Sequence, residues 1–434
     1  MANEGIATGV APLRPGLDTR IGEVGFVLVL LLIFVGLTPF DARTSAAIAA
    51  RDAATASGDV LRQVAFLGTF VLILYAALRQ RGVLAITAVP PLVGLLLLWC
   101  LASSLWTDEP AIVARRAVLA AIFVLSMLLS VDTLGVTRSL TIWRNLMAVL
   151  ILTDIASCLV VPAAVHQPSD LEAGLAGAWR GLHSHKNQAG SIAACATALF
   201  FFFALETRRR SDMLLCAASL FFLVMTRSKS SLGLLPVALI AGGLYRVAWR
   251  NKLDRAIAGV AAVLLAVVVT GVVFYEWSFI ARVLEDPQQF TGRAAIWSAE
   301  LAYIHDHPLL GAGFGSFGNT GVRSPIYYYV GPGWVSQIGE GHSGYLEMLV
   351  TIGGIGFAIS VLALVVQPFA QFWRADRTDA NFNAMLFTLF TFDMLHNFME
   401  SDFIQVTSAQ WGQILLIIAL LRLSAREMRE RVRP

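Results

Sequence analysis

Charged residues are scarce in this sequence. Asp, Glu, Lys and Arg make up only 14% of the 434 residues, whereas hydrophobic residues make up 57% and the mean hydropathy is +0.70. Soluble domains usually carry about 25% charged residues. The composition therefore excludes an ordinary soluble protein and predicts an all-α, polytopic membrane protein. We expect a lipid bilayer, and no nucleic acid, as a partner. The formal net charge of +3 says little in itself, because the position of Lys and Arg matters more than their sum.

Cysteines are also few, and a phosphate-binding nucleotide loop is missing. The four cysteines all lie in apolar runs, without C-x-x-C or Cys/His metal spacing: Cys100, Cys158, Cys195 and Cys216. Such cysteines are expected to pack in the core. The sequence has no G-x-x-x-x-G-K-[ST] loop, so nothing in it indicates that ATP drives the protein.

Long apolar runs are present instead, and most reach the length that crosses a bilayer, roughly 20 residues. They predict about twelve transmembrane helices, at 24–39, 60–78, 84–102, 112–130, 139–161, 189–205, 213–226, 232–249, 256–277, 345–369, 382–395 and 408–421. The first run has the character of a signal-peptide core or a span, and its length favours an uncleaved span. The resulting division is a tail over 1–22, nine helices over 23–277, a long loop over 278–342, three helices over 343–423 and a tail over 424–434.

The position of Lys and Arg predicts the orientation of these helices, because cytoplasmic loops carry the excess of positive charge. With both termini in the cytoplasm, nearly every short basic loop falls on the cytoplasmic side. The opposite face then receives every segment with an unusual cluster of polar residues: 41–59, 103–111, 162–188, 227–231, 278–342 and 396–407. We therefore expect the functional site on the extracytoplasmic face.

Several arginines remain on that face, against the charge rule. Snorkelling to the membrane surface or pairing with acidic neighbours such as Glu109 explains any one of them. As a group, planar guanidinium forks suit a diphosphate or a similar polyanion, which they bind in a bidentate manner. The arginines concerned include Arg116, Arg180, Arg227 and Arg293.

Two motifs resemble cofactor sites but lack the required context. His183-Ser-His185 and His305-Asp-His307 have H-x-H spacing, but no cluster of further ligands completes a zinc site, so no metal is expected. For the second pair a helix end before Pro308, with imidazoles bonded to local backbone, is the preferred interpretation. The run from Gly313 to Gly318 has G-x-G-x-x-G spacing without the strand that a dinucleotide fold needs. We expect these glycines to let a loop pass close to a ligand or a helix.

His342 differs from the other histidines because it lies where the long loop re-enters the bilayer. An imidazole in that position is partly desolvated yet reachable from water. It suits a general base, since the ordinary histidine pKa is near neutrality. The alternative is a histidine that only caps the start of the next helix.

Taken together, these residues resemble the O-antigen ligase and polymerase superfamily of bacterial envelope glycosyltransferases. The resemblance covers roughly residues 103–360 and rests on Ser104-Leu-Trp106, the Arg115/Arg116 pair, Arg180-Gly, His185-Lys186-Asn187, Thr226-Arg227-Ser228-Lys229-Ser230, Gly292-Arg293, His307-Pro308-Leu-Leu-Gly311-Ala-Gly313-Phe-Gly315 and Gly341-His342-Ser-Gly-Tyr345-Leu-Glu347. His396-Asn397-Phe-Met-Glu400-Ser-Asp402 looks most like the exopolysaccharide polymerase branch.

The resemblance implies a GT-C-like protein of the bacterial inner membrane with its active site facing the periplasm. It implies metal-independent transfer of glycan from an undecaprenyl-diphosphate-linked oligosaccharide, without a cofactor. By position, His342 would be the catalytic base, and Arg180, Arg227, Arg293 and Arg116 would bind the diphosphate. Possible acceptor or sugar contacts are His185, Lys186, Asn187, Tyr345 and Glu400.

The product is the open question within this chemistry. A polymerase would lengthen a glycan into exopolysaccharide or O-antigen, with a chain-length regulator as a possible partner. A ligase would pass the glycan to lipid A core or to a protein. A transporter of lipid-linked sugars also suits twelve spans, but transporters place their sites near the bilayer midplane between internal repeats, and no repeat is evident here.

Overall fold

The computed structural model describes residues 16–42, 58–170, 173–248, 293–318, 323–331, 341–374 and 380–432, with a few isolated positions between them. The predicted span at 256–277 lies almost entirely outside the described residues, as do the first 15 residues and the start of the long loop at 278–292. In the described part, the regular elements are helices, with one isolated bridge between Val165 and Trp179.

The helices follow the order of the predicted apolar runs. They are α1 Leu17–Phe34, α3 Val60–Arg81, α4 Pro91–Ala102, α5 Pro110–Leu134, α6 Val136–Val160, α7 Lys186–Thr207, α8 Arg210–Thr226, α9 Lys229–Ala248, α12 Arg293–Asp306, α13 Gly344–Val361, α14 Gln367–Arg374, α15 Ala380–His396 and α16 Ala409–Val432. A π-helical segment, Leu362–Val366, joins α13 to α14. The helix α12 lies within the long loop predicted at 278–342.

Six of the described helical segments are long and apolar enough to cross a membrane: Val60–Ala88, Pro110–Leu134, Val136–Val160, Lys186–Thr207, Lys229–Ala248 and Gly344–Arg374. Large apolar side chains are exposed on each of them. In α3, for example, Val64 is 61% exposed and Val71 is 56% exposed, while Phe66 and Ile73 are buried. A helix that is hydrophobic all round fits a lipid environment. The fold is thus that of an all-α, multi-pass membrane protein, and the number twelve stays a prediction.

The predicted span at 84–102 differs from the structure. Residues Gly82–Ala88 form a 3-10 segment that continues from α3, and α4 begins only at Pro91. The reason is the Pro90-Pro91 pair, which lacks two backbone N–H donors and cannot continue a helix from the preceding turn. The helix α4 therefore has only 12 residues, which corresponds to about 18 Å.

The glycine run after α12 packs against a break in α13. Gly353 has non-helical backbone angles within that helix, and the loop backbone satisfies the neighbouring groups: Ala312 and Gly313 donate to the carbonyls of Val350 and Thr351, and Gly354 donates to Pro308. A Cβ on Gly311 would lie 2.6 Å from the Gly353 nitrogen. Of the two alternatives for this run, close passage of a helix is therefore the one observed.

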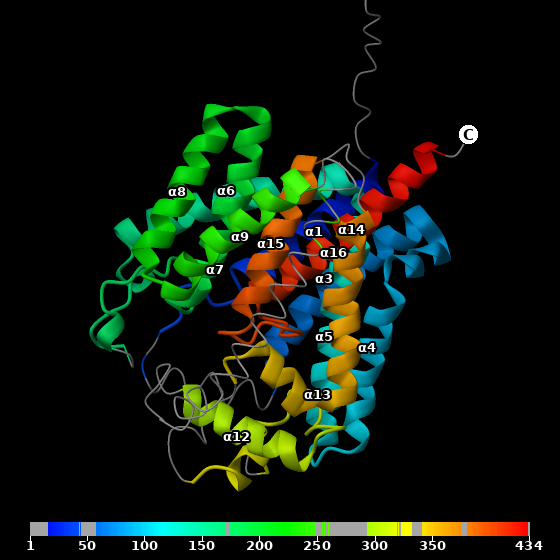
Figure 1. Cartoon of the computed structure of the whole chain (residues 1–434), viewed down its shortest axis with the longest axis vertical. Coiled ribbons are helices and arrows are strands. Elements are labelled where there is room, and N and C mark those ends of the chain that lie inside the picture. The colour runs from blue at the N-terminus through cyan, green and yellow to red at the C-terminus, as the bar shows by residue number, and fades with distance from the viewer. Residues whose placement is uncertain are drawn as a thin grey trace, which may run out of the picture.

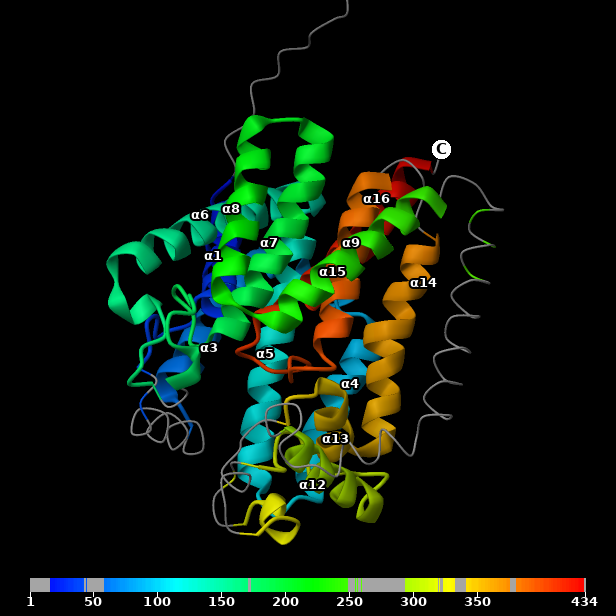
Figure 2. The same ribbon diagram turned by 60° about the vertical axis from the view of Figure 1, so that its left-hand side comes forward.

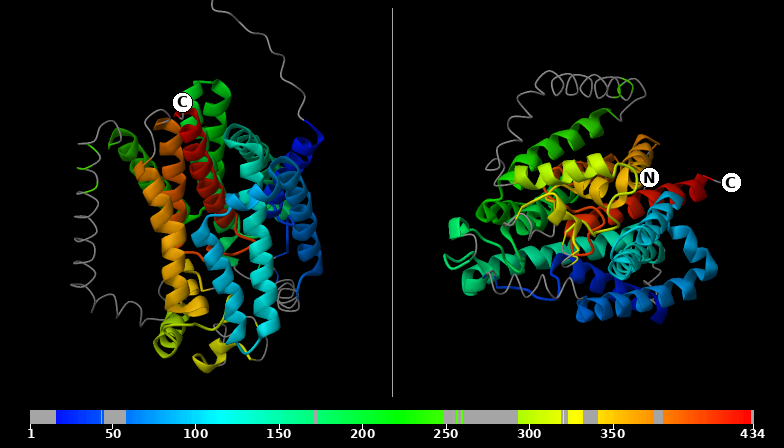
Figure 3. Two further views of the ribbon diagram at one scale, coloured as in Figure 1. Left: turned by 90° about the vertical axis from the view of Figure 1, so that its right-hand side faces the viewer. Right: turned by 90° about the horizontal axis from the view of Figure 1, so that it is seen from below.

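The molecule has two distinct ends along the direction of the long helices. Figures 1 and 2 show α12 at one end, here called the α12 end, and the last turns of α16 toward the other, here called the α16 end. Between them, α13 and the π-helical segment Leu362–Val366 run beside α4, which in turn packs against α5, as the side view in Figure 3 shows.

The six segments predicted on one face do lie together. Five hydrogen bonds link the described parts of all six: Arg180 to the Asp41 carbonyl, Phe314 N to the Ser103 hydroxyl, Lys186 to the Arg227 carbonyl, Asn187 to Glu400, and Arg293 to Glu400. The polar segments thus form one connected region toward the α12 end.

Candidate active site

The loop between α15 and α16 is held by its own side chains. The Asn397 amide oxygen accepts from the backbone N–H groups of Asp402 and Phe403, at 3.2 and 3.0 Å. The Asp402 carboxylate in turn pairs with His396 Nδ1 at 2.7 Å and accepts from the Ser408 hydroxyl at 2.8 Å. These bonds fix the conformation of the loop and therefore the position of Glu400 within it.

Glu400 joins three segments that are far apart in sequence. Its Oε1 lies 2.8 Å from Nη2 of Arg293, at the start of α12, and 3.0 Å from the amide nitrogen of Asn187, in the first turn of α7. Its Oε2 lies 3.3 Å from Nδ1 of His342. Arg293 also donates to the Met399 carbonyl. We call Glu400, His342, Arg293 and Asn187 the Glu400 cluster.

The electrostatics of this cluster keep Glu400 ionised. Burial acts to raise the pKa of Glu400, but the hydrogen bond from His342 and the positive charge of Arg293 outweigh it and lower the pKa to about 2. An ionised carboxylate only accepts hydrogen bonds, so Nδ1 of His342 carries the proton. In the neutral imidazole, Nε2 then keeps its lone pair and is able to take up a proton. The His342 side chain is 36% exposed, so solvent can reach it.

The backbone around His342 is tied to the same loop. Gly344 N donates to the carbonyls of Asn397 and Glu400, at 2.8 and 3.0 Å, and Ser343 N donates to the Ser401 hydroxyl. His342 itself has a φ of +53°, a left-handed conformation that is uncommon outside glycine. Such strained residues persist where the surroundings determine them, often at functional sites.

Two further carboxyl groups, those of Glu347 and Glu300, lie beside Gly341, the residue before His342. Glu347 Oε2 accepts from Gly341 N at 2.9 Å, and the buried Glu300 carboxyl lies so close to Gly341 that a Cβ there would be 1.9 Å from its Oε1. Burial and the negative charge of Glu347 raise the pKa of Glu300 well above its usual range. Trp297 donates to the Gly341 carbonyl at 3.0 Å. Glu300 was not predicted from the sequence. The signal that could have identified it is its position on the same buried face of α12 as Ala294, Ile296 and Tyr303.

His185 and Lys186 position the first turn of α7. His185 is the N-cap of this helix and accepts from Asn187 N at 3.2 Å, while the Lys186 ammonium donates to the Arg227 carbonyl at 3.0 Å. Both contacts orient Asn187, which reaches Glu400. Tyr345 lies in the first turn of α13, and its hydroxyl donates to the Met394 carbonyl of α15 at 2.9 Å.

The four predicted phosphate-binding arginines have different partners in the described structure. Arg293 is in the Glu400 cluster, and the other three have no hydrogen bond or ion pair to Glu400 or His342 in the described structure. Arg180 is 3% exposed and donates to the carbonyls of Asp41, His183 and Ser184. Arg116 donates to the Gly315 carbonyl. Arg227 is exposed and lies 3.4 Å from the Ala176 carbonyl.

One histidine of each H-x-H pair, His183 and His307, contacts a protein side chain. The helix α12 ends at Asp306, and the His307 ring stacks on Tyr303 with centroids 4.4 Å apart. His183 pairs through Nε2 with the buried Asp154, at 3.1 Å. Over the described ranges, no three His, Cys, Asp or Glu side chains are grouped so as to hold a metal ion.

Residues 214–361 match a family model described as O-antigen ligase. The matched region contains α12, the glycine run and His342, and it supports the predicted O-antigen ligase and polymerase superfamily. The exopolysaccharide polymerase branch is not tested by this match. No curated protein matches the chain.

Proposed function

We propose that this protein is a membrane glycosyltransferase that lengthens glycans on undecaprenyl diphosphate, with the Glu400 cluster facing the periplasm. The O-antigen ligase match supports a lipid-linked glycan donor and a glycan acceptor in general terms. The observation that carries the proposal is Glu400, which holds a partly exposed imidazole and a guanidinium on one ionised carboxylate. This arrangement offers one proton acceptor beside one anion-binding group.

His342 acts as the general base in this proposal. Its Nε2 takes the proton from the acceptor hydroxyl, and the hydroxyl oxygen forms a bond to the anomeric carbon of the donor. The bond from that carbon to the phosphate oxygen breaks, and its electron pair leaves with undecaprenyl diphosphate. Attack opposite the leaving group inverts the anomeric configuration. Glu400 fixes the imidazole tautomer and stabilises the imidazolium that forms, as a carboxylate does in a catalytic triad.

Arg293 stabilises the leaving diphosphate. Glu400 and Met399 engage two of its nitrogen atoms, and a guanidinium has five N–H donors in all, so donors remain for phosphate oxygens. Preorganised charge at the leaving group is a large contribution to such a reaction. Arg227 and Arg116 are proposed as further diphosphate contacts. Arg180, through its three carbonyl bonds, would position the segment that leads to Asn187.

A ligase is the second candidate, because the matching family is described as O-antigen ligase. The same base and the same diphosphate site serve both reactions. The acceptor differs: a second lipid-linked glycan for a polymerase, and lipid A core or a protein for a ligase.

The product of the purified protein tests the proposal. The full chain in nanodiscs would receive a defined undecaprenyl-diphosphate oligosaccharide, with and without lipid A core, and the glycans would be analysed by mass. Longer lipid-linked glycans would support the polymerase, and glycan on lipid A core would support the ligase. Movement of unchanged substrate across the membrane, without a new glycosidic bond, would contradict both.

A further inference from the structure

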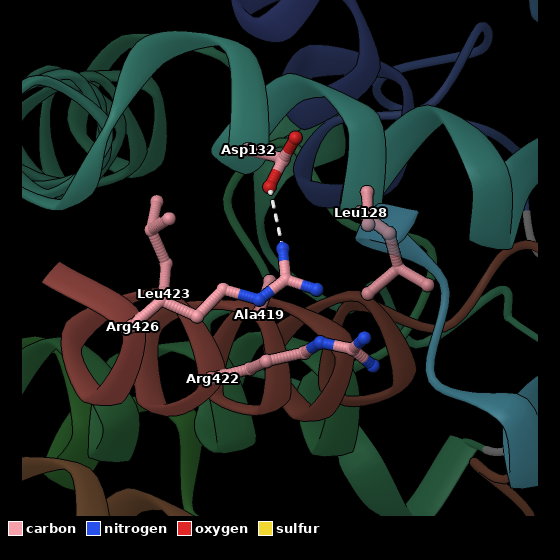
Figure 4. A pocket seen from close by; sticks show the side chains of 7 residues that line it. Leu128, Asp132, Ala419, Arg422, Leu423 and Arg426 are labelled. Atoms are coloured by element: carbon pink, nitrogen blue, oxygen red, sulfur yellow. Dashed lines mark hydrogen bonds and ion pairs between the residues drawn. The ribbon is translucent and has the colours of Figure 1, made fainter. Parts of the chain in front are cut away.

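A basic pocket lies at the α16 end, away from the Glu400 cluster. Seven residues line it: Ala88, Leu128, Asp132, Ala419, Arg422, Leu423 and Arg426. Figure 4 shows the guanidinium groups of Arg422 and Arg426 extending from α16 toward the same side, with Arg426 directed at Asp132. The Arg426–Asp132 distance is 3.4 Å.

The positive charges around this pocket exceed the negative ones. Arg81 pairs with Asp132 at 2.7 Å, so this one carboxylate is shared by Arg81 and Arg426. Arg422 and Arg426 also donate to the same carbonyl, that of Thr87, at 2.8 and 2.6 Å. Three guanidinium groups thus surround a single carboxylate. Glu427 forms no ion pair with any of them in the described residues; a Cβ on Gly135 would lie 3.9 Å from its Oε1.

Local helix electrostatics explain part of this arrangement. Asp132 lies in the last turn of α5, where the helix dipole disfavours a negative charge, and one or two arginines compensate for it. Other ion pairs toward the α16 end match one cation with one carboxylate: Arg79 with Asp18, and Arg138 with Glu23. These ion pairs leave Arg422 without a carboxylate of its own among the described residues.

An exposed apolar segment adjoins the pocket. Thr87, whose carbonyl binds both arginines, belongs to the 3-10 segment Gly82–Ala88. In this segment Val83 is 85% exposed, Leu84 is 62% exposed and Ile86 is 77% exposed. Large apolar side chains at that exposure, beside an excess of positive charge, match a molecule with an anionic head and hydrocarbon chains. Basic pockets between membrane helices are known to bind phospholipid head groups.

We propose that Arg422 and Arg426 bind the phosphate of an anionic phospholipid whose acyl chains lie along Val83, Leu84 and Ile86. The lipid would connect α16 to the turn between α3 and α4. This site is independent of the transfer reaction and lies toward the opposite end from His342.

The test compares nanodiscs of phosphatidylcholine with nanodiscs that also contain phosphatidylglycerol. Phosphatidylglycerol should raise the thermal unfolding midpoint of the wild-type protein. In the Arg422→Gln/Arg426→Gln variant the apparent affinity for phosphatidylglycerol should fall by about a hundredfold, since each of two direct, charge-assisted hydrogen bonds to the phosphate contributes about a factor of ten. The matched control, Arg79→Gln/Arg138→Gln, removes two positive charges toward the same end and should keep the wild-type response.

One further variant and one further ligand separate lipid binding from misfolding and from binding of free phosphate. Asp132→Asn raises the net charge of the pocket and should tighten binding of phosphatidylglycerol, a change that misfolding would not produce. Inorganic phosphate, added to the protein in phosphatidylcholine alone, should give no comparable stabilisation. An unchanged response in the double arginine variant, weaker binding in Asp132→Asn, or an equal effect of inorganic phosphate would overturn the proposal.

Discussion

The Glu400 cluster and the ion pairs toward the α16 end use the same residue types in different ways. Toward the α16 end, apart from the pocket at Asp132, Arg138 pairs with Glu23 and Arg144 pairs with Asp212, one cation to one carboxylate. In the Glu400 cluster, one carboxylate binds a guanidinium, an imidazole and an amide from three distant segments. The first arrangement neutralises charge locally, and the second assembles a site.

The difference predicts which substitutions matter for transfer. Arg138 is 50% exposed, and pairs with such an exposed member usually contribute about 0–1 kcal/mol to stability, because water screens the charge. Arg293 is only 13% exposed, and its partner Glu400 serves three residues, so changing one member alters the others. We therefore expect large effects on activity in the cluster and small ones at the other end.

Replacement of the base should have the largest effect. His342→Ala removes the proton acceptor, and loss of a general base typically costs about 100-fold to 10,000-fold in rate. The rate of glycan transfer by the purified variant checks this. His307→Ala is the matched control, because its ring stacks on Tyr303 and, among the described residues, no hydrogen bond or ion pair joins it to Glu400. Full activity in a folded His342→Ala protein would remove His342 from the mechanism.

A smaller but distinct loss is expected from Arg293→Lys. The lysine keeps the charge but cannot bind Glu400 and a phosphate oxygen with one planar fork, so kcat should fall by about tenfold or more. Arg323→Lys is the control, since Arg323 is exposed and lies 4.0 Å from Glu109. Equal kcat values for both variants and the wild type would return Arg293 to a structural role.

The pH dependence of stability should identify Glu400 as an ionised group. Its pKa of about 2, below the usual value of 4.5, means that its stabilising effect is complete above about pH 4.5 and is lost as the pH falls through 2. The difference in unfolding midpoint between the wild type and Glu400→Gln should be constant near neutral pH and smaller at about pH 3. Thermal unfolding at both values measures it. A difference that grows on acidification would contradict the assignment.

The smallest effect is expected toward the α16 end. Arg138→Gln breaks an exposed pair with Glu23 and should change the free energy of unfolding by about 1 kcal/mol or less, with the transfer rate unchanged. Denaturant titration and the transfer assay check the two parts. A loss of activity as large as that of His342→Ala would remove the contrast between the two regions.

Hydropathy and charge predicted much of this fold because lipid imposes strong rules on both. In the described part of the chain, apolar runs form helices wherever they have no internal break, and the described parts of the segments predicted on one face do meet. The helix α4 begins late because the Pro90-Pro91 pair interrupts a run that is apolar throughout. A hydropathy profile does not show that proline lacks the backbone N–H donor that a helix needs.

The contacts of the site could be predicted only in part. His342, Arg293, Asn187 and Glu400 were all candidates from the sequence, but the bond from His342 to Glu400 joins residues 58 positions apart, and no local pattern encodes it. Arg180 illustrates the converse. Its charge indicated a phosphate, whereas its buried guanidinium donates to three backbone carbonyls, a use that depends on the path of a loop.

A double-mutant cycle on the transfer rate tests the central claim, that His342 and Glu400 act as one unit. The wild type, His342→Ala, Glu400→Gln and the combined variant would be assayed with the same lipid-linked oligosaccharide. If Glu400 acts through the imidazole, its replacement should slow the wild type but scarcely change the His342→Ala protein. Losses that simply multiply in the combined variant would show that the two residues work independently, and would contradict the proposed site.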